Sequence, residues 1–581
     1  MAVLFDGSFM RSLHAWEAEF SKPVYRDAEV EAWLFEDEPA RRAAEARLAA
    51  LGVRARLRSA YKPFVHFFLE GADLDGLVAA RVRYPVHPAA APNRFTLEAY
   101  PLAGMLGDAS LTFEAGDESL WYDVELRYAD GRLTRHRVFA PNHVAVDHLG
   151  EATLSPTGWV RVSGEGASGA VTCDERRTTD IEQLFEAAVR TVVGHDWGQS
   201  EPYFERLLLR ADLAGIEREP GCGDELISTF EALHEDFYFS LLEFFQRHSG
   251  RPLGDRGLQP GQIVPDVRCA DRASSHLRIC TESFAHIEVE PKTDFVPLAE
   301  TQAPLSARCI ARALGGLEGQ RFAATSREGR EVLGVYRPGP GPAVLISGGQ
   351  HANETSGVVG ALRAAQVLQQ QGVAHFAVIA SENPDGYALH QALCATHPRH
   401  MHHAARYSAL GDDIAYRERA PLLERAARDQ AIHLSGAKLH INLHGYPAHE
   451  WTRPLSGYLP RGFELWTIPK GFFLVLRHHP GWLEAAQYLL AGVTARLALV
   501  PGLLDFNMRQ IAWFRAHALA DGFDTLNGIP VQFTESTREA TPLSLITEFP
   551  DETIYGDAFR FAHDVQTAAV LAAVEVYRAG G

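Results

Sequence analysis

Residues 343–372, AVLISGGQHANETSGVVGALRAAQVLQQQG, decide the fold of the second half of the chain. The apolar run AVLISGG is typical of a buried strand. The residues after it repeat apolar side chains at helical spacing, begin with Thr355 and Ser356 as capping candidates, and close on Gly372. A polar group, residues 350–354, lies at the carboxyl end of the strand, where open α/β sheets form their ligand sites. The sequence therefore predicts an α/β domain with a site at this strand end.

Three side chains at strand ends are candidates to hold a metal ion. His351 and Glu354 are three residues apart on one tight turn, so an imidazole and a carboxylate can converge on a single cation. His444 ends another apolar run, KLHINLHG. Two histidines and one carboxylate suit Zn²⁺ and leave one position open for water, as in catalytic zinc sites. We therefore expect one Zn²⁺ per chain. The alternatives are histidines at the surface or hydrogen-bonded in the core and, for Glu354, a charge that favours a helix N-terminus.

A general base is expected at Glu548. Metal-activated water must lose a proton as it attacks a carbonyl carbon, and the departing amine must gain one. Glu548 lies at the end of the apolar run SLITEF, beside Ile546, Phe549 and Pro550, and such surroundings raise the pKa of a carboxyl group. We assign the proton transfer to Glu548, with an ordinary strand-end carboxylate as the alternative.

The order of these landmarks resembles the zinc carboxypeptidases, peptidase family M14, and their relatives among the amino-acid deacylases. The sequence carries His-x-x-Glu as HANE, an Asn-Pro-Asp-Gly turn at residues 383–386, a strand ending in NLHG, and a late strand ending in ITEFPDE. The resemblance covers residues 303–581. It implies a carboxypeptidase-like mixed eight-stranded sheet flanked by helices, and removal of a C-terminal residue from a peptide.

The resemblance also implies two arginines, one that stabilises the oxyanion and one that binds the terminal carboxylate of the substrate. We expect Arg399 in the first role and Arg417 in the second, with Arg406 as a further substrate-binding candidate. The sequence departs from the family in two places. Tyr416 precedes Arg417 where the family has Asn, and residues 489–554 contain no tyrosine where the family has a substrate-capping one.

Further histidines surround these candidates. The segment after residue 396 contains a cluster of four: His397, His400, His402 and His403. Because His402 and His403 are adjacent and poorly spaced for joint chelation, we expect a polar loop at the rim of the cleft rather than a second metal site. His449 and Glu450 are expected at the rim or behind the metal ligands.

The first 300 residues divide into three expected segments. Residues 1–75 are expected to form a small α/β unit, residues 76–170 an antiparallel β-rich region, and residues 171–300 a helical region with a linker. The expected strands cover residues 29–35, 53–70, 94–102, 120–140 and 158–164, and the expected helices cover residues 38–52, 180–194, 202–215 and 225–250.

The catalytic domain is expected to cover residues 301–581. Its boundary is marked by a Pro/Gly-rich passage around residues 251–265 and by the passage PKTDFVPLAETQAPLS at residues 291–306. The front region is thus a large α+β unit, with substrate positioning or homo-oligomerisation as its expected role.

Composition and charge limit the kind of partner. The chain has 581 residues, enough for two or three domains, and a net charge of −19 from 74 acidic and 55 basic side chains. This charge opposes nucleic acid and anionic membrane surfaces, so neither is expected as a partner. Asp6 and Arg11 interrupt the apolar residues near the N-terminus, so we expect no secretion signal and a cytoplasmic location. The six cysteines are expected to be reduced and mostly buried.

Three functions follow from this sequence. The first is a zinc metallocarboxypeptidase that acts on a peptide. The second is a zinc-dependent deacylase or amidase that acts on an N-acyl amino acid or a modified peptide. The third is a non-catalytic zinc-binding recognition protein, against which the presence of all three ligands and the base argues.

Overall fold

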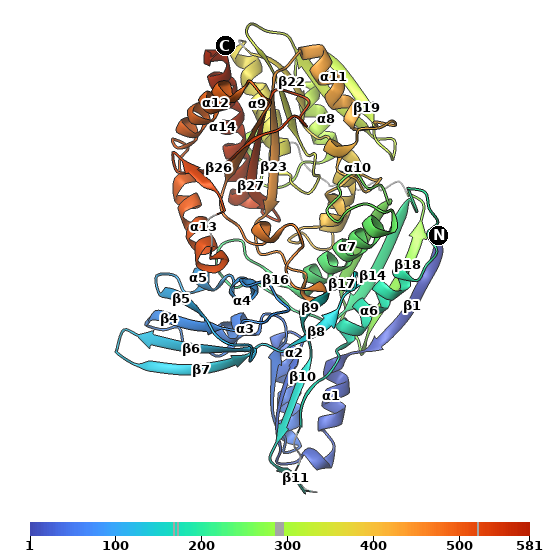
Figure 1. The fold of residues 1–581 in the computed structure, drawn as a ribbon, viewed down its shortest axis with the longest axis vertical. Helices are drawn as coiled ribbons and strands as arrows, with labels where there is room; N and C mark the ends of the chain where they lie inside the picture. The colour runs from blue at the N-terminus through green and yellow to red at the C-terminus, as the bar shows by residue number, and fades with distance from the viewer. Residues whose placement is uncertain (167–168, 171–172, 285–295, 373, 520–521, 581) are drawn as a thin grey trace.

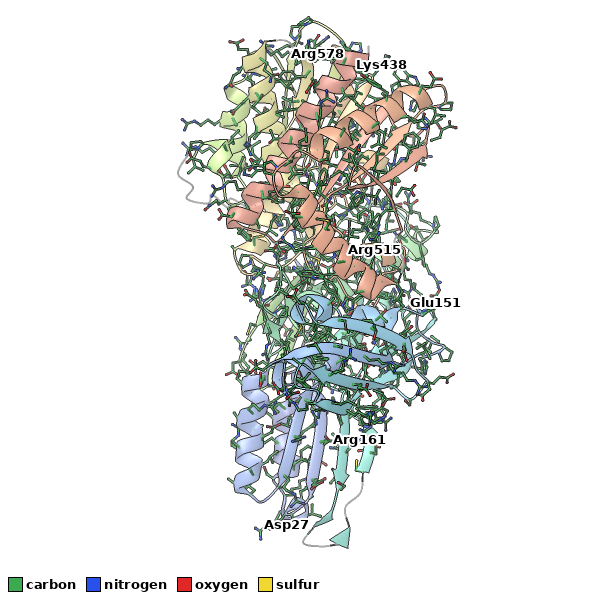
Figure 2. The ribbon with its side chains drawn as sticks, turned by 90° about the vertical axis from the view of Figure 1, so that its left-hand side faces the viewer. Asp27, Glu151, Arg161, Lys438, Arg515 and Arg578 are labelled. Atoms are coloured by element: carbon green, nitrogen blue, oxygen red, sulfur yellow. The ribbon has the colours of Figure 1, made fainter. Side chains whose placement is uncertain are left out.

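In the computed structural model, the back half of the chain forms one end of an elongated molecule and contains a large mixed sheet (Figure 1). The residues of the expected site lie on the strands of this sheet and on the loops that follow them. The structure describes residues 1–166, 169–170, 173–284, 296–372, 374–519 and 522–580. Residues 291–295 of the expected boundary passage lie outside them. Figure 2 shows Asp27 at one end of the long axis and Arg578 at the other, so the front and back halves lie along that axis.

Within the described residues, the sheet of the back half has nine strands. Its three central pairings, β22 with β21, β21 with β23 and β23 with β27, are parallel, and antiparallel pairings lie on both sides. In spatial order the strands are β19 (Gln320–Thr325), β20 (Glu331–Arg337), β22 (His375–Ile379), β21 (Ala343–Gly348), β23 (Leu439–Pro447), β27 (Leu543–Glu552), β24 (Phe473–His478), β26 (Ile529–Glu535) and β25 (Asp524–Leu526). The mixed α/β sheet is confirmed. Eight strands were expected, and the ninth is the three-residue edge strand β25, too short to give an alternating sequence pattern.

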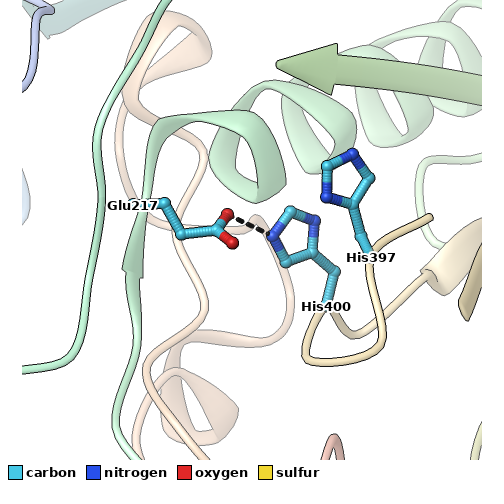
Figure 3. A group of neighbouring side chains, drawn as sticks. All are labelled: Glu217, His397 and His400. Atoms are coloured by element: carbon cyan, nitrogen blue, oxygen red, sulfur yellow. Dashed lines mark hydrogen bonds and ion pairs between the residues drawn. The ribbon is translucent and has the colours of Figure 1, made fainter.

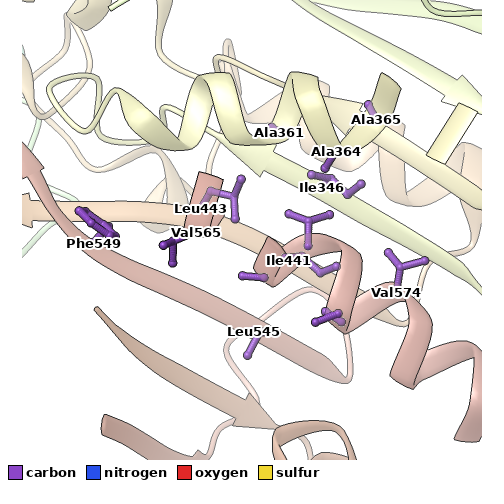
Figure 4. Packing of buried hydrophobic residues seen from close by; sticks show 14 of the residues in the cluster. Ile346, Ala361, Ala364, Ala365, Ile441, Leu443, Leu545, Phe549, Val565 and Val574 are labelled. Carbon is purple, nitrogen blue, oxygen red and sulfur yellow. The ribbon is translucent and has the colours of Figure 1, made fainter. Parts of the chain in front are cut away.

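Helices cover both faces of this sheet. On one face pack α9 (Ser356–Gln371), α12 (Leu483–Leu497) and α14 (Gly556–Gly580), and on the other lies α11 (Arg425–Ser435). Figure 4 shows Ala361, Ala364 and Ala365 of α9 above Ile441 and Leu443 of β23. All nine residues of β23 are buried, which explains its continuous apolar run.

The ends of two helices show how the site is placed. The expected Gly372 closes α9 in the left-handed conformation, with φ of 70°, as a helix C-terminus favours. The Asn-Pro-Asp-Gly turn opens α10 (Pro384–Cys394), because the Asn383 side chain accepts a hydrogen bond from the Gly386 N–H at 3.0 Å. The remaining helices of this half are α8 (Ala307–Gly315) and α13 (Leu503–Ala518).

The described part of the front half contains three four-stranded sheets, besides two-stranded ones. The first orders β1 (Ala2–Met10), β18 (Ser274–Glu282), β14 (Arg206–Leu213) and β17 (Gln262–Cys269), with α6 (Asp180–Val193) and α7 (Thr229–His248). The second orders β13 (Cys173–Arg176), β10 (Trp159–Ser163), β2 (Glu29–Leu34) and β3 (Arg54–Ser59), with α1 (Ser12–Phe20) and α2 (Glu38–Ala50). The third orders β5 (Ser110–Ala115), β4 (Leu77–Tyr84), β6 (Trp121–Tyr128) and β7 (Leu133–Phe139), with α3 (Pro63–Glu70), α4 (Arg94–Glu98) and α5 (Leu102–Met105). The expected segments 1–75 and 171–300 therefore share one sheet, because β1 of the first pairs with β18 of the second.

We propose residue 300 as the main division of the chain, since all strands of the nine-stranded sheet follow it.

Three expected elements of the front half are wrong. Residues 202–215 form β14 instead of a helix, because residues 207, 209, 211 and 213 are buried in alternation. Residues 94–102 contain the buried helix α4 instead of a strand. The expected long strand at 53–70 ends at Ser59, and α3 begins at Pro63, whose fixed φ suits the first turn of a helix.

Two expectations on exposure and membranes can be compared with the structure. All six cysteines are in described residues and are free thiols, but only Cys280 is buried, so the expectation of mostly buried thiols is wrong. Among the described residues, no helix combines the length and apolar character that crossing a bilayer requires.

Helix α7 joins the two halves. Seventeen of its twenty residues are buried, and several carry charge. Four acidic side chains of α7 bind groups of the back half. Glu231 Oε2 lies 2.7 Å from His449 Nε2, and Glu235 Oε2 lies 2.6 Å from His403 Nδ1. Asp236 Oδ1 accepts a hydrogen bond from the Ser456 N–H at 2.9 Å, and Glu243 Oε1 accepts one from Arg453 at 2.7 Å. These buried polar pairs, together with a hydrophobic cluster that contains residues of both halves, attach the front half firmly to the back half.

Candidate metal centre

Three buried side chains converge at the carboxyl ends of β21 and β23. The two carboxylate oxygens of Glu354 lie 2.8 Å from His351 Nδ1 and 2.9 Å from His444 Nδ1. The two Nδ1 atoms are 3.1 Å apart. All three residues are buried, and the donor atoms lie within 4.8 Å of one another. The structure thus brings together the three residues that the sequence singles out as metal ligands.

The parallel strands explain this convergence. His351 and Glu354 lie in the turn between β21 and α9, and His444 lies on β23, next to β21. In the register of β23 and β27, His444 is opposite Glu548. Residues at the same register position of adjacent strands point to the same face of a sheet, so Glu548 reaches the same cavity as the histidines.

The environment of Glu548 favours its protonated form. Burial and the neighbouring Glu354 carboxylate raise the pKa of Glu548 well above its ordinary value, against the opposing effect of Arg406 and Lys470. Burial lowers the pKa of Lys470 to about 8, and Glu548 partly offsets this. A carboxyl group on the wall of the same cavity as the candidate metal ligands is placed to accept and return a proton.

Asp413 is a site residue that the sequence analysis missed. Its Oδ2 lies 3.4 Å from His351 Nε2, and its Oδ1 accepts hydrogen bonds from Gln350 at 2.8 Å and from the Ala415 N–H at 3.0 Å. A carboxylate on the far nitrogen fixes the orientation of a metal-binding imidazole. The only sequence signal is the pair of aspartates in GDDIAYRER, which does not point to His351.

His351, His444 and Glu548 line a cavity of about 1270 Å³, including its open mouth, and Glu354 lies behind the two histidines. Its wall is rich in aromatic side chains: Phe239, Tyr407, Tyr416, Tyr446, Trp451, Phe463 and Trp466. It also contains six arginines: Arg256, Arg406, Arg425, Arg428, Arg477 and Arg538. The cavity therefore offers apolar surface for a side chain or acyl group and positive charge for an anionic group.

The three arginines expected in the site have different positions. Arg406 lines the cavity and donates to Glu354 Oε1 at 2.7 Å. Arg399 is not part of the cavity wall; it pairs with Glu219 and donates to the Asp224 carbonyl at 3.0 Å. Arg417 is buried and outside the wall as well. Its guanidinium is held by Asp412, Ser408 and Glu424. The structure thus does not bring Arg399 and Arg417 to the cavity wall, because each guanidinium has acidic partners elsewhere.

The structure supplies two other cations on the cavity wall. Arg256, from the loop between α7 and β17, lies 3.7 Å from the Asp413 carboxylate, and its carbonyl accepts from the Asp413 N–H at 2.9 Å. Arg538 is exposed and stacks on the Tyr416 ring, 3.4 Å from its centroid. Arg256 lies in the front half, where no sequence pattern connects it to the strand ends of the back half.

The remaining histidines also separate. His403 lines the cavity, as expected for a rim loop. His397 and His400 lie together with Glu217 of the front half, a residue that the sequence analysis did not connect with them. His449 and Glu450, expected at the rim or behind the metal ligands, are buried at the interface between the halves, where His449 bonds Glu231 and Glu450 pairs with Lys62; neither lines the cavity.

Comparisons with known proteins give structural likenesses of low identity. No family model matches the sequence, and no curated protein matches it. The solved structures similar to this chain include a metallo-carboxypeptidase from Burkholderia cenocepacia, 15% identical, which covers 53% of this chain and 76% of its own with a TM-score of 0.28. A metallo-carboxypeptidase from Pseudomonas aeruginosa in complex with (2-guanidinoethylmercapto)succinic acid is 17% identical, with coverages of 53% and 74% and a TM-score of 0.28. Bovine thrombin-activatable fibrinolysis inhibitor is 10% identical, with coverages of 47% and 95% and a TM-score of 0.28.

Proposed function

We propose that this chain is a metal-dependent hydrolase of amide bonds, with His351, Glu354 and His444 as the ligands of one Zn²⁺ and Glu548 as the general base. One observation carries the proposal. Three buried side chains of the types that zinc prefers come together, and two of them, His351 and His444, line a cavity that Glu548 also lines.

The donor set fits a tetrahedral cation. Bonds of about 2.0–2.2 Å place tetrahedral ligand atoms roughly 3.3–3.6 Å apart. The two imidazole nitrogens, 3.1 Å apart, need only a small expansion to reach that spacing, and each lies within 2.9 Å of one of the two carboxylate oxygens of Glu354. A cation held there would supply Lewis acidity to a carbonyl oxygen and to a water molecule.

The protein's own groups then divide the remaining work. Glu548 accepts the proton of the attacking water and returns it to the departing amine. Arg406, 2.7 Å from Glu354 and on the cavity wall, replaces Arg399 as the residue that stabilises the oxyanion. Asp413 holds His351 in orientation.

The reaction we favour is removal of a C-terminal residue from a peptide. A free α-carboxylate needs a cation on the cavity wall, and Arg256 and Arg538 both lie there. Arg417, which was expected in this role, is already bound by two carboxylates. The proposed substrate is therefore a peptide with a free carboxyl end, bound by Arg256 and Arg538.

A zinc-dependent deacylase is the second candidate. The observation that favours it is the aromatic wall, including Trp451, Phe463 and Trp466, which suits an acyl group as well as a peptide side chain. The two functions differ in whether cleavage requires a carboxylate next to the scissile bond.

The test uses the purified full chain, its metal content by mass spectrometry, and a panel of free peptides, their amidated forms and N-acyl amino acids. Glu548→Gln should bind the same amount of zinc as wild type and lose measurable turnover. Glu539→Gln, a change of the same kind on the cavity wall, is the matched control and should keep turnover. Retained turnover in Glu548→Gln would overturn the assignment of the base, and cleavage confined to acylated or amidated substrates would favour the deacylase.

A further inference from the structure

A second group of metal-binding side chain types lies outside the cavity wall. Figure 3 shows Glu217, on β15 (Glu217–Arg218), pointing toward His400, with His397 beside it on the same loop. β15 pairs with β16 (Ile227–Ser228) immediately before α7, in the front half. The two histidines belong to the loop after α10, in the back half. The cluster therefore joins two segments that are far apart in the sequence.

The geometry of the cluster resembles that of a three-ligand site. One ligand atom from each of Glu217, His397 and His400 lies within 4.8 Å of the other two. His400 Nε2 is 2.8 Å from Glu217 Oε2. The two imidazole rings are stacked in parallel, with centroids 4.4 Å apart and planes 2° from parallel. Because the lone pairs of parallel rings do not point at one common position, one imidazole must rotate for both rings to bind the same ion.

One nitrogen in the cluster is unused. His397 Nε2 is buried, and within the described part of the chain it has no hydrogen-bond partner. A buried polar atom without a partner costs free energy unless water or an ion binds it. Ser228 brings a further oxygen to the cluster: its Oγ donates to Glu217 Oε2 at 3.0 Å and lies 3.3 Å from His400 Nε2.

The loop and its charged neighbours leave the cluster free to bind a cation. The His397 carbonyl accepts hydrogen bonds from His402 Nε2 at 2.7 Å and from the His400 N–H at 3.3 Å, which fixes the loop. The nearby Arg399 pairs with Glu219 rather than with Glu217. The exposed side of Glu217 gives an ion access from solvent.

We propose that Glu217, His397 and His400 form a second binding site for a divalent transition metal ion such as Zn²⁺, separate from the site in the cavity. Two imidazole nitrogens and one carboxylate oxygen are ligands that Zn²⁺ accepts, with solvent or Ser228 at the remaining position. Because the ligands come from both halves, a bound ion holds β15 of the front half against the loop after α10. Its role is structural and does not depend on the proposed hydrolase activity.

The experiment is a calorimetric titration of the chelator-stripped full chain with Zn²⁺, with thermal unfolding as a second readout. Wild type should bind two ions per chain. Glu217→Gln should weaken the second binding event by at least about tenfold, the lower bound seen when even outer partners of a ligand are removed. Glu219→Gln is the matched control, because it removes an exposed acid two residues away that pairs with Arg399. It should still bind two ions.

A second variant guards against compensation by water at the position of Glu217. His397→Ala should abolish Zn²⁺ binding at the Glu217 cluster, together with the rise in Tm that this binding produces. Glu354→Gln should remove only the binding of Zn²⁺ at His351 and His444. The proposal is wrong if wild type binds a single Zn²⁺ that Glu354→Gln removes, or if Glu217→Gln and His397→Ala both titrate as wild type does.

Discussion

Oε2 of Glu235 on α7 lies 2.6 Å from Nδ1 of His403, a cavity-lining residue of the back half. Both side chains are buried, so the bond forms in a medium of low dielectric constant and fixes the ring. The front half therefore shapes the wall of the candidate active site through α7. Phe239, one turn further along α7, lines the same cavity.

The two candidate oxyanion arginines can be separated by mutation. Arg406→Ala should lower kcat by about 10²- to 10³-fold, because it removes a fixed positive charge beside the reacting centre. Arg399→Ala should leave kcat within about twofold of wild type, as is usual for a group that does not contact the substrate. Steady-state kinetics on the best peptide substrate gives both values. The reverse result would return the oxyanion role to Arg399.

Arg256 is expected to set the preference for a free carboxylate. Arg256→Ala should raise KM for free-carboxylate peptides by about 10- to 100-fold, the loss of one charged hydrogen bond, with a small effect on kcat. The KM of the same variant for amidated peptides should be unchanged, because these peptides have no free carboxylate for Arg256 to bind. Arg210→Ala, in the front sheet and paired with Asp212 and Asp266, is the control for removal of an arginine away from the cavity. Equal loss on free and amidated peptides would contradict this role.

The interface between the halves should be sensitive to the loss of one acid. Glu243→Gln leaves the buried Arg453 without its anionic partner, and such a change costs about 3–5 kcal/mol of unfolding free energy. Glu125→Gln breaks an exposed pair with Arg135 and should cost no more than about 1 kcal/mol. Urea unfolding at one pH compares the two. A loss of similar size in both variants would mean that the interface pair contributes little.

Acid should weaken the contact between α13 and the front half through His517. This ring is buried, accepts from the Ala103 N–H at 3.2 Å and lies 2.8 Å from the Thr96 carbonyl. Burial lowers the pKa of His517 to about 3. Below the unfolded value of about 6.5 the unfolded chain binds a proton that the folded chain excludes, so stability falls by about 1.4 kcal/mol per pH unit from there toward pH 3.

The measurement is the unfolding free energy at pH 7 and at pH 5 for wild type and His517→Gln. In His517→Gln, the unfolding free energy should differ less between pH 7 and pH 5 than it does in wild type. His14→Gln, a change at an exposed histidine, should keep the difference. An unchanged pH dependence in His517→Gln would assign the acid sensitivity to other groups.

The core of the candidate site could be predicted from the sequence because it follows from local pattern. A buried parallel strand appears in the sequence as an apolar run, and polar residues at the end of that run lie toward the carboxyl edge of the sheet. His444 and Glu548 lie in the last part of β23 and β27, and His351 follows β21. Their convergence needed only the assumption that their strands are neighbours.

The rest of the site depends on contacts that local pattern does not encode. Arg256 and Glu217 approach the back half from loops and short strands of the front half, and their side chains are ordinary for an exposed surface. Arg399 and Arg417 fit the spacing of a family, but Glu219 and Asp412 bind them elsewhere. Residues 202–215 carry apolar side chains that fit both a helix and a strand, and pairing with β17 and β18 decided between them.

The loop between α7 and β17 has a consequence for how related chains can diverge. Residues 252–254 of this loop are exposed, while α7 before it and β17 after it are largely buried. Insertions or exchanges in such a loop cost little folding free energy. Since Arg256 reaches the cavity from this loop, the range of accepted substrates can change there without disturbing the strands that carry the candidate ligands. We expect selectivity and chemistry to be inherited separately in this architecture.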